Sequence, residues 1–556
     1  MFKKARLIII TASIAVSSLF FYSFKDDSFE IVKNLDIYYT LFKELNLHYV
    51  DEIKPGDLVK KSIDEMLQSL DPYTSYITES EIEDYRFMTT GQYGGIGALI
   101  RGATEYVVIT DPYEGYPANK AGLKAGDMIL EIDGKTTKGK NSSDISELLK
   151  GQPNTPVKLL IKRPFPDEQF EKTLQREEIK IKNVNYSGMI DDQVAYIRLM
   201  NFTEQAGKEV KDALQELKEK KNAKYLILDL RGNPGGLLME AVNIVNLFVD
   251  QGQDIVSTKG KVKQWDKTYK ATSSPIDKEI PIVVLVNSGS ASASEIVSGA
   301  IQDIDRGVVI GQRTFGKGLV QTTRDLTYNA KLKVTTAKYY IPSGRCIQAL
   351  DYSHRNIDGS VGKVPDSLIT EFKTKKGRKV YDGGGVNPDI TIEPERLSKI
   401  SESLFIKNYI FDYATKFANE KKQIVAAKEF HLSDAEYDDF IKFLSGKNFD
   451  YETKSEETLK QLKEIAKNEK YLDIAQSEFD ALQKKLAHDK EKDLRSFKEE
   501  IKELIEDEII GRYYFQSGRV EASLAKDEAV KKAVEVLKDP KKYSAILDGS
   551  ATSTSK

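Results

Sequence analysis

The stretch IVVLVNSGSASASEIVSGAI, residues 282–301, carries the strongest structural signal in the chain. Its first five residues form an apolar run typical of a buried strand, and Ile296 to Ile301 is typical of the first turns of a helix. The small hydroxyl residues between them therefore lie at a strand-to-helix junction. Unpaired backbone N–H groups and the positive end of the helix dipole can stabilise an oxyanion there. The run holds a candidate nucleophile, although capping a helix is the commoner use of serine.

A glycine-containing turn is a second candidate element of a catalytic site. Residues 229–238 read DLRGNPGGLL and form another strand-to-helix turn. The pair Gly235-Gly236 would let backbone N–H groups approach a reacting carbonyl closely, as an oxyanion hole requires. Taken alone, the segment is equally compatible with a phosphate-type or plain helix-start loop.

A lysine between glycines is the third element. Residues 311–321 read GQRTFGKGLVQ, and Lys317 has three apolar neighbours, Phe315, Leu319 and Val320. Burial by these neighbours would lower the pKa of the amine, and a neutral lysine can act as a general base. A solvated loop charge is the commoner role of such a lysine. No histidine lies in a comparable motif, so a Ser-His-Asp triad has no candidate.

The composition excludes several classes of function. The 556 residues are long for one domain, and three or four domains are expected. The net charge of -3 provides no basic field, so no nucleic-acid partner is expected. The chain has one cysteine, Cys346, and four scattered histidines without an HExxH motif. These counts exclude an intramolecular disulfide and argue against a metal hydrolase, so we expect neither a metal nor another cofactor.

The N-terminus has the pattern of an export signal. Lys3, Lys4 and Arg6 precede a mostly apolar stretch, residues 7–24. That stretch is near the lower length limit of a membrane-spanning helix, about 17–25 residues. No clean A-x-A site follows it, and both a cleaved signal peptide and an uncleaved anchor fit. We expect an exported, periplasmic protein, soluble or anchored to the inner membrane by residues 7–24.

A peptide-binding domain is indicated by short strands and two helices over about 80 residues. Residues 118–133 read ANKAGLKAGDMILEID, and together with the glycine-rich segment before them they resemble a PDZ domain. Glycines would let backbone N–H groups face the carboxylate of a peptide C-terminus, while a strand edge adds the peptide by β-augmentation. The expected peptide-binding residues are Tyr93, Gly94, Gly95, Ile96 and Gly97.

Alternating strands and helices follow residue 180 and predict a parallel sheet covered by helices. The expected elements are strands at 194–199, 225–230 and 282–286 and helices at 204–220 and 237–249. An extended strand is expected at 332–341. Beyond Arg396 the sequence becomes rich in Lys and Glu, with helical periodicity. Solvated helical hairpins are the favoured interpretation there, with an oligomerisation or partner arm as a further option.

The three catalytic-looking segments together resemble the C-terminal processing (tail-specific) peptidases, serine proteases that use a Ser-Lys dyad. The R-x-N-x-G-G turn, the SASASE run and the G-K-G-x-x-Q segment occur in the family's order. The resemblance implies that Ser292 is the nucleophile and that Lys317 is the general base and then the acid for the leaving amine. Gln321 would orient the lysine. Ser288, Ser290 and Ser294 are left with turn and cap roles.

The resemblance also implies an oxyanion hole and one accessory residue. The backbone N–H of Ala293 and one from Gly235-Gly236 would bind the oxyanion. Glu295 matches a family position, either as an accessory residue or as a carboxylate favoured by the helix dipole. The LDPYT segment, residues 70–74, matches as well. The resemblance covers about residues 30–395 and leaves the Lys/Glu-rich remainder unexplained.

The expected fold class is α/β within a multidomain chain, with a ClpP/crotonase-like protease core. The expected domains are a signal peptide or anchor (1–25), a helical region (26–87), a PDZ domain (88–170), a protease core to which the helical region contributes (171–396), a charged helical domain (397–548) and a disordered tail (549–556).

The predicted function is that of an exported serine endopeptidase that cleaves proteins at or near their C-termini, with the PDZ domain capturing the substrate C-terminus. The expected partners are protein or peptide substrates, with self-association or an adaptor through the helical regions and a homo-oligomeric state. The alternative is a PDZ adaptor whose protease-like core does not cut.

Overall fold

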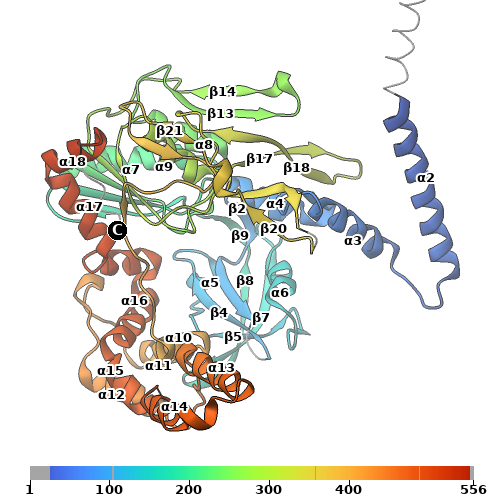
Figure 1. The fold of residues 1–556 in the computed structure, drawn as a ribbon. Helices are drawn as coiled ribbons and strands as arrows, with labels where there is room; N and C mark the ends of the chain where they lie inside the picture. The colour runs from blue at the N-terminus through green and yellow to red at the C-terminus, as the bar shows by residue number, and fades with distance from the viewer. Residues whose placement is uncertain (1–24, 103–104, 357, 487–488, 551–556) are drawn as a thin grey trace, which may run out of the picture.

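The computed structural model describes residues 25–102, 105–356, 358–486 and 489–550 (Figure 1). The signal or anchor segment predicted at residues 7–24 lies outside the described residues, as do residues 551–556 of the predicted tail. Within the described ranges, no helix combines the length and the apolar character that crossing a membrane requires.

A six-stranded sheet forms the centre of the core, in the order β10-β11-β12-β15-β16-β23. Neighbouring strands from β11 to β23 run parallel, and β10 is antiparallel to β11. The predicted parallel sheet is therefore confirmed. The strands are β10 (Val184–Met189), β11 (Val194–Leu199), β12 (Tyr225–Asp229), β15 (Ile282–Val286), β16 (Val308–Gly311) and β23 (Ile390–Thr391).

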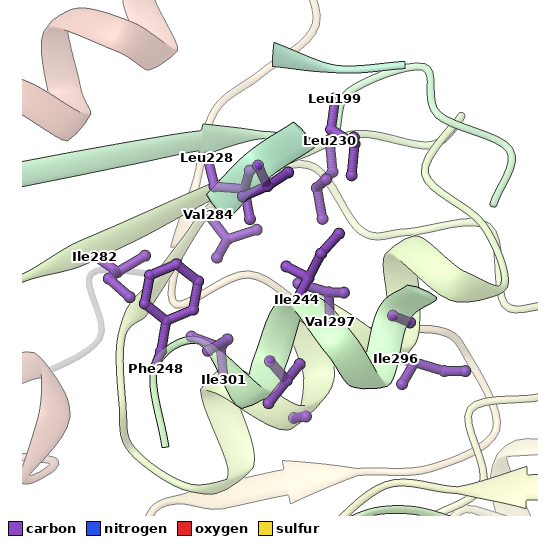
Figure 2. Close-up of a cluster of buried hydrophobic side chains, with 14 of the residues drawn as sticks. Leu199, Leu228, Leu230, Ile244, Phe248, Ile282, Val284, Ile296, Val297 and Ile301 are labelled. Atoms are coloured by element: carbon purple, nitrogen blue, oxygen red, sulfur yellow. The ribbon is translucent and has the colours of Figure 1, made fainter. Parts of the chain in front are cut away.

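Three helices cover one face of this sheet: α7 (Ala206–Lys221), α8 (Leu238–Asn246) and α9 (Ala293–Asp303). Alternate strand residues point toward them, because side chains along a strand alternate between its faces. Figure 2 shows Leu228 and Val284 from the sheet facing Ile244 and Val297 from the helices. All four side chains are buried, so this cluster fixes the start of α9 against the end of β15.

The other face of the same sheet is covered by the last two helices, α17 (Glu528–Lys538) and α18 (Pro540–Leu547). Ile227 and Leu285 from the strands pack with Val530 and Leu537 from α17. The interpretation of the Lys/Glu-rich region as solvated hairpins is therefore wrong for these helices. Their charged residues face water, while their apolar stripe completes a three-layer core.

A second sheet lies beside the core and contains β1 (Ser75–Ile77), β18 (Lys331–Tyr340), β13 (Asp254–Gly260), β14 (Lys267–Lys270) and β17 (Leu319–Asp325), which pairs with β18. Strand β18 is the extended strand expected at 332–341. It also pairs with β1, so a segment from before the PDZ domain is built into the protease core. Short ribbons flank the sheet: β19 (Leu350–Arg355) with β20 (Val361–Lys363), and β21 (Glu371–Lys373) with β22 (Lys379–Tyr381).

The PDZ region is an antiparallel sheet with two helices. Its elements are β3 (Ala98–Gly102), β4 (Val107–Pro112), α5 (Pro117–Lys120), β5 (Met128–Ile132), β6 (Lys135–Thr136), α6 (Ser142–Leu149), β7 (Pro156–Pro164) and β8 (Asp167–Gln175). The predicted end of the PDZ domain, residue 170, falls inside strand β8. Its sequence DEQFEKTLQ is mostly polar because most of its residues are exposed or half-buried, so it gives little strand signal.

A two-stranded ribbon joins this domain to the core. The ribbon pairs β2 (Gln92–Gly95), where the chain enters, with β9 (Glu177–Lys180), where it leaves. Before the ribbon come α2 (Lys25–His48), α3 (Pro55–Gln68) and α4 (Ile82–Thr90), the last of which follows a short 3-10 turn, Glu79–Glu81. Helix α2 extends away from the core (Figure 1) and contacts α3, where the hydroxyls of Tyr38 and Ser62 are 2.6 Å apart.

The remaining C-terminal helices form a separate bundle with its own apolar core. They are α10 (Lys399–Ile406), α11 (Tyr409–Glu420), α12 (Asp434–Phe443), α13 (Lys454–Asn468), α14 (Leu472–Leu486), α15 (Lys490–Ser496) and α16 (Lys498–Ser523). A short 3-10 turn, Ala427–Glu429, lies between α11 and α12, and two others, Lys263–Trp265 and Asp366–Leu368, lie outside the bundle. Helix α16 runs from this bundle toward the core, and the PDZ domain lies between core and bundle (Figure 1).

Candidate active site

Ser292 occupies the junction between β15 and α9, at the N-cap of the helix. Its φ of 56° and ψ of -112° lie outside the regions that a serine ordinarily adopts, a kind of strain that clusters at functional sites. Its carbonyl accepts the N–H groups of Glu295 (2.9 Å) and Ile296 (3.0 Å). The first turn of α9 thus holds Ser292 in this strained conformation, and the positive end of the helix dipole lies at its side chain.

The neighbouring serines have structural partners. The Ser290 hydroxyl donates to the Leu230 carbonyl (2.8 Å), and the Ser294 hydroxyl donates to the Asn233 carbonyl (2.9 Å). Both residues are fully buried, whereas Ser288 is exposed and Ser292 is half-buried. Within the run, the two buried hydroxyls hold the serine loop onto the glycine-containing turn.

The glycine pair lies directly against the serine. A side chain on Gly235 would meet Ala291 O at 2.7 Å, and Ala293 N and Ser292 Cβ at 2.8 Å, and its φ of 96° favours glycine. Its N–H donates to Asn233 Oδ1 (2.9 Å). This bond favours the N–H of Gly236, rather than that of Gly235, as the oxyanion donor that partners Ala293.

Lys317 is half-buried in the same region. Burial, followed by the positive charge of Lys333, lowers its pKa to about 8. Its ammonium lies 4.3 Å from the centroid of the Tyr73 ring. The apolar cover therefore comes in part from the LDPYT segment, whereas Phe315, which the sequence suggested for this role, is half exposed.

The LDPYT segment is itself fixed by a buried carboxylate. Asp71 accepts the N–H groups of Tyr73 (2.8 Å) and Thr74 (2.9 Å). The Thr74 hydroxyl oxygen in turn accepts the N–H of Thr335 in β18 (3.1 Å). These bonds set the Tyr73 ring over the lysine, a function that the sequence did not reveal.

Glu295 joins the two catalytic loops. Its fully buried carboxylate accepts four hydrogen bonds, from the N–H groups of Ser292 (2.9 Å), Gly316 (2.7 Å) and Lys317 (2.8 Å) and from the Thr314 hydroxyl (2.6 Å). Burial raises its pKa to about 7, although these bonds oppose the shift. Glu295, for which the sequence suggested an accessory or dipole-favoured role, thus lies one layer behind Ser292 and Lys317.

Tyr339 is a second connection that the sequence did not indicate. It is almost fully buried, and its hydroxyl donates to the carbonyl of Ser292 (3.1 Å) and to that of Lys317. Gln321, expected to orient the lysine, donates instead to Thr335 Oγ1 (3.1 Å). Among the described residues no hydrogen bond joins Gln321 to Lys317.

A cleft of about 520 Å³ brings these groups together. Its wall includes Ser292, Lys317 and Gln321 as well as both glycines of the turn. Helix α4 and the start of the ribbon β2–β9 form another part of the wall, through residues such as Tyr85, Phe87 and Gly91. The cleft therefore lies where the core meets the connection to the PDZ domain.

The predicted carboxylate-binding loop of the PDZ domain, residues 93–97, starts in this connection. Tyr93 packs edge-on against Phe87 of α4, with ring centroids 5.2 Å apart. The carbonyls of Ile96 and Gly97 accept the N–H groups of Ala118 (2.8 Å) and Tyr113 (2.9 Å). Residues 93–95 of the predicted loop belong instead to strand β2, whose backbone pairs with β9, so only Ile96 and Gly97 lie beyond the paired ribbon.

Comparison with known proteins identifies the chain. The sequence profile of peptidase family S41 matches residues 193–353, and that of a PDZ domain matches 108–163. The chain is 36% identical over 353 residues to the carboxy-terminal-processing protease of Bartonella bacilliformis, which covers 63% of this chain and 78% of that protein. The chain belongs to the carboxy-terminal-processing proteases of family S41. It is a serine-type peptidase that carries a PDZ domain.

Other S41 relatives show the same range of similarity. The probable CtpA-like serine protease of Staphylococcus aureus (strain MRSA252) is 36% identical over 344 residues, 61% of this chain and 68% of that protein. Among solved structures, the photosystem II D1 C-terminal processing protease is 30% identical, with a TM-score of 0.36, over 65% of this chain and 93% of that one.

The C-terminal bundle also has a counterpart. A profile described as a probable PDZ-protease C-terminal helical domain matches residues 400–537. The Lys/Glu-rich region that the sequence resemblance left unexplained is thus a recurrent domain of PDZ-containing proteases. Its matched range includes most of α17, which in the structure covers the protease sheet.

Proposed function

We propose that Ser292 and Lys317 form the catalytic dyad of an endopeptidase that cleaves proteins at or near their C-termini. The observation that best supports this proposal is that both residues line one cleft, together with the glycine turn that packs against Ser292. A lysine pKa lowered to about 8 leaves a useful fraction of neutral amine near neutral pH.

The proposed reaction has two halves. The Lys317 amine takes the proton from Ser292 Oγ as the oxygen attacks the substrate carbonyl. The N–H groups of Ala293 and Gly236 stabilise the oxyanion. The Lys317 ammonium then protonates the leaving amine, and an acyl-enzyme ester on Ser292 results. Water, deprotonated by the same lysine, attacks the ester, and the serine is released.

We propose that the PDZ domain supplies the selection for C-termini. Ile96 and Gly97, beyond the paired ribbon, would offer N–H groups to a terminal carboxylate, and the free edge of β3 would pair with the peptide backbone. In the part of the chain that the structure describes, β3 pairs only with β4, which supports this use of its other edge. We further propose export of the chain, which rests on the basic flank and the apolar residues 7–24.

The test compares single variants on an unfolded protein such as casein. We expect Ser292→Ala and Lys317→Ala to lose turnover, and a fluorophosphonate probe to label the wild type at Ser292. Ser288→Ala, which changes an exposed serine of the same run, is the matched control and should retain activity. Full turnover by Ser292→Ala or by Lys317→Ala would refute the dyad.

A further inference from the structure

Lys333 is a second lysine in the catalytic cleft, and the proposed reaction does not use it. It lies on β18, opposite Thr323 of β17 and Ser75 of β1. Tyr339, which contacts Ser292, lies further along the same strand. Lys333 and Tyr339 both line the cleft with Lys317.

The Lys333 ammonium lacks an acidic partner. In the described part of the chain, no hydrogen bond or ion pair joins it to another residue. Burial alone lowers its pKa. The positive charge of Lys333 also lowers the pKa of Lys317, and both lysines line the same cleft.

Two other shielded cations of this protein have carboxylate partners. Arg345 bonds Asp303 at 2.8 Å, and Arg378 bonds Asp305 at 2.7 Å. A partly desolvated cation without a counter-ion costs free energy that a bound anion recovers. The cleft is the place from which such an anion can reach Lys333, because the side chain forms part of its wall.

We propose that Lys333 binds a carboxylate of the substrate, on the side of the leaving fragment. The inference rests on the proposed dyad, because Lys317 must protonate the leaving amine and Lys333 lies beside Lys317. Two sources supply this chemistry: the free α-carboxylate of a short C-terminal fragment, or an acidic side chain just after the cleaved bond. Lys333 thereby adds a selection for the residues that are cut off, separate from capture by the PDZ domain.

The test uses one casein-derived peptide that the wild type cleaves, shortened to leave two residues after the cleaved bond. It is made as the free acid, as the C-terminal amide, and as an amide with Glu in the leaving fragment. We expect the wild type to prefer a carboxylate-bearing form over the plain amide by about 10-fold or more in kcat/KM. If only the free acid is preferred, Lys333 binds the α-carboxylate. If the amide with Glu is also cleaved faster than the plain amide, Lys333 binds an acidic side chain.

The preference is then measured in Lys333→Met, Lys333→Arg and Lys338→Met. Lys338 is an exposed lysine of the same strand outside the cleft lining and is the matched control. We expect the ratio between peptides to fall toward one in Lys333→Met and to persist in the other two. Because the ratio is taken within one variant, a change in the pKa of Lys317 or in overall stability cancels.

Two results would overturn the proposal. A wild type that cleaves the free acid, the plain amide and the Glu-containing amide equally, in a Ser292-dependent manner, refutes the carboxylate site and leaves the dyad intact. An unchanged ratio of kcat/KM between the peptides in Lys333→Met also refutes the carboxylate site and leaves the dyad intact. If the wild type and Ser292→Ala act identically on every peptide, the proposed function fails, and the carboxylate site fails with it.

Discussion

At the scale of single residues, the pKa of the proposed base is set by its surroundings. The Tyr73 ring covers the Lys317 ammonium, and burial is the largest cause of the lowered pKa. The base must be neutral to accept a proton, so kcat/KM should rise with pH through about 8. The exposed fraction of one amine thereby governs the pH at which the enzyme works.

Replacing Tyr73 tests this dependence. We expect Tyr73→Ala to admit water and to raise the pKa of Lys317 toward its ordinary value of 10.5, which moves the rise in kcat/KM to higher pH. The expected shift is about one to two pH units. Tyr73→Phe keeps the ring and is the control. A pH profile of Tyr73→Ala that coincides with that of the wild type would show that the ring does not shield the lysine.

Glu295 gives a second prediction at this scale. Glutamine would replace one acceptor oxygen with a donor and leave buried N–H or O–H groups unpaired, at about 1–3 kcal/mol each. We expect Glu295→Gln to lower both kcat and the melting temperature, because the serine and lysine loops lose their common anchor. Glu279→Gln changes an exposed carboxylate and should do neither.

The same variant carries a pH signature. The pKa of Glu295 is raised from 4.5 to about 7, so the stability gained by protonating it is fully present below pH 4.5 and is lost as the pH rises through 7. The glutamine side chain does not titrate, so the stability of the variant lacks this pH dependence. The unfolding free energy of the wild type relative to Glu295→Gln should therefore fall from about pH 5 to pH 8. A relative stability that rises over this range would contradict the raised pKa.

At the scale of secondary-structure elements, α17 is part of the protease core. Leu537 is almost fully buried against the sheet. We expect Leu537→Ala to cost about 2–5 kcal/mol of unfolding free energy, as large-to-small core substitutions do. The control on the same helix is Glu535→Ala, which removes exposed ion pairs with Lys532 and Lys542 and should cost about 1 kcal/mol or less. Equal stability of the two variants in urea unfolding would show that α17 is not part of the core.

The elements predicted correctly from the sequence are those with a local signal. The strand β15 and the start of α9 are adjacent in sequence, and an apolar run followed by small hydroxyl residues identifies both. The packing of α17 has no local signal, because its apolar stripe pairs with strands more than two hundred residues earlier in the chain. Likewise, the contacts of Tyr73 and Tyr339 have no local signal. The pairing of β1 with β18 brings the segment of Tyr73 to the core, and the pairing of β17 with β18 places Tyr339 beside the lysine loop.

At the scale of the whole molecule, the C-terminal bundle holds the PDZ domain from the side opposite the core. Arg101 of β3 donates to Asn408 and stacks on Phe411, with the guanidinium 4.6 Å from the ring centroid. Gln516 of α16 donates to Asp111 of β4 (2.7 Å). These polar contacts resemble those of transient domain interfaces, where relative motion is the default expectation.

Loosening this contact should change the motion of the PDZ domain without unfolding the core. We expect the double variant Arg101→Ala/Gln516→Ala to show faster hydrogen exchange in the ribbon β2–β9, because the domain then has fewer contacts with the bundle to restrain it. The melting transition of the core should shift little. Lys135→Ala, an exposed change elsewhere in the same PDZ sheet, is the control. Exchange as slow in the double variant as in this control would show that the bundle does not restrain the domain. Since Tyr93 of the ribbon packs on Phe87 in the cleft wall, faster exchange accompanied by altered kcat/KM would place the PDZ position under control of the C-terminal bundle.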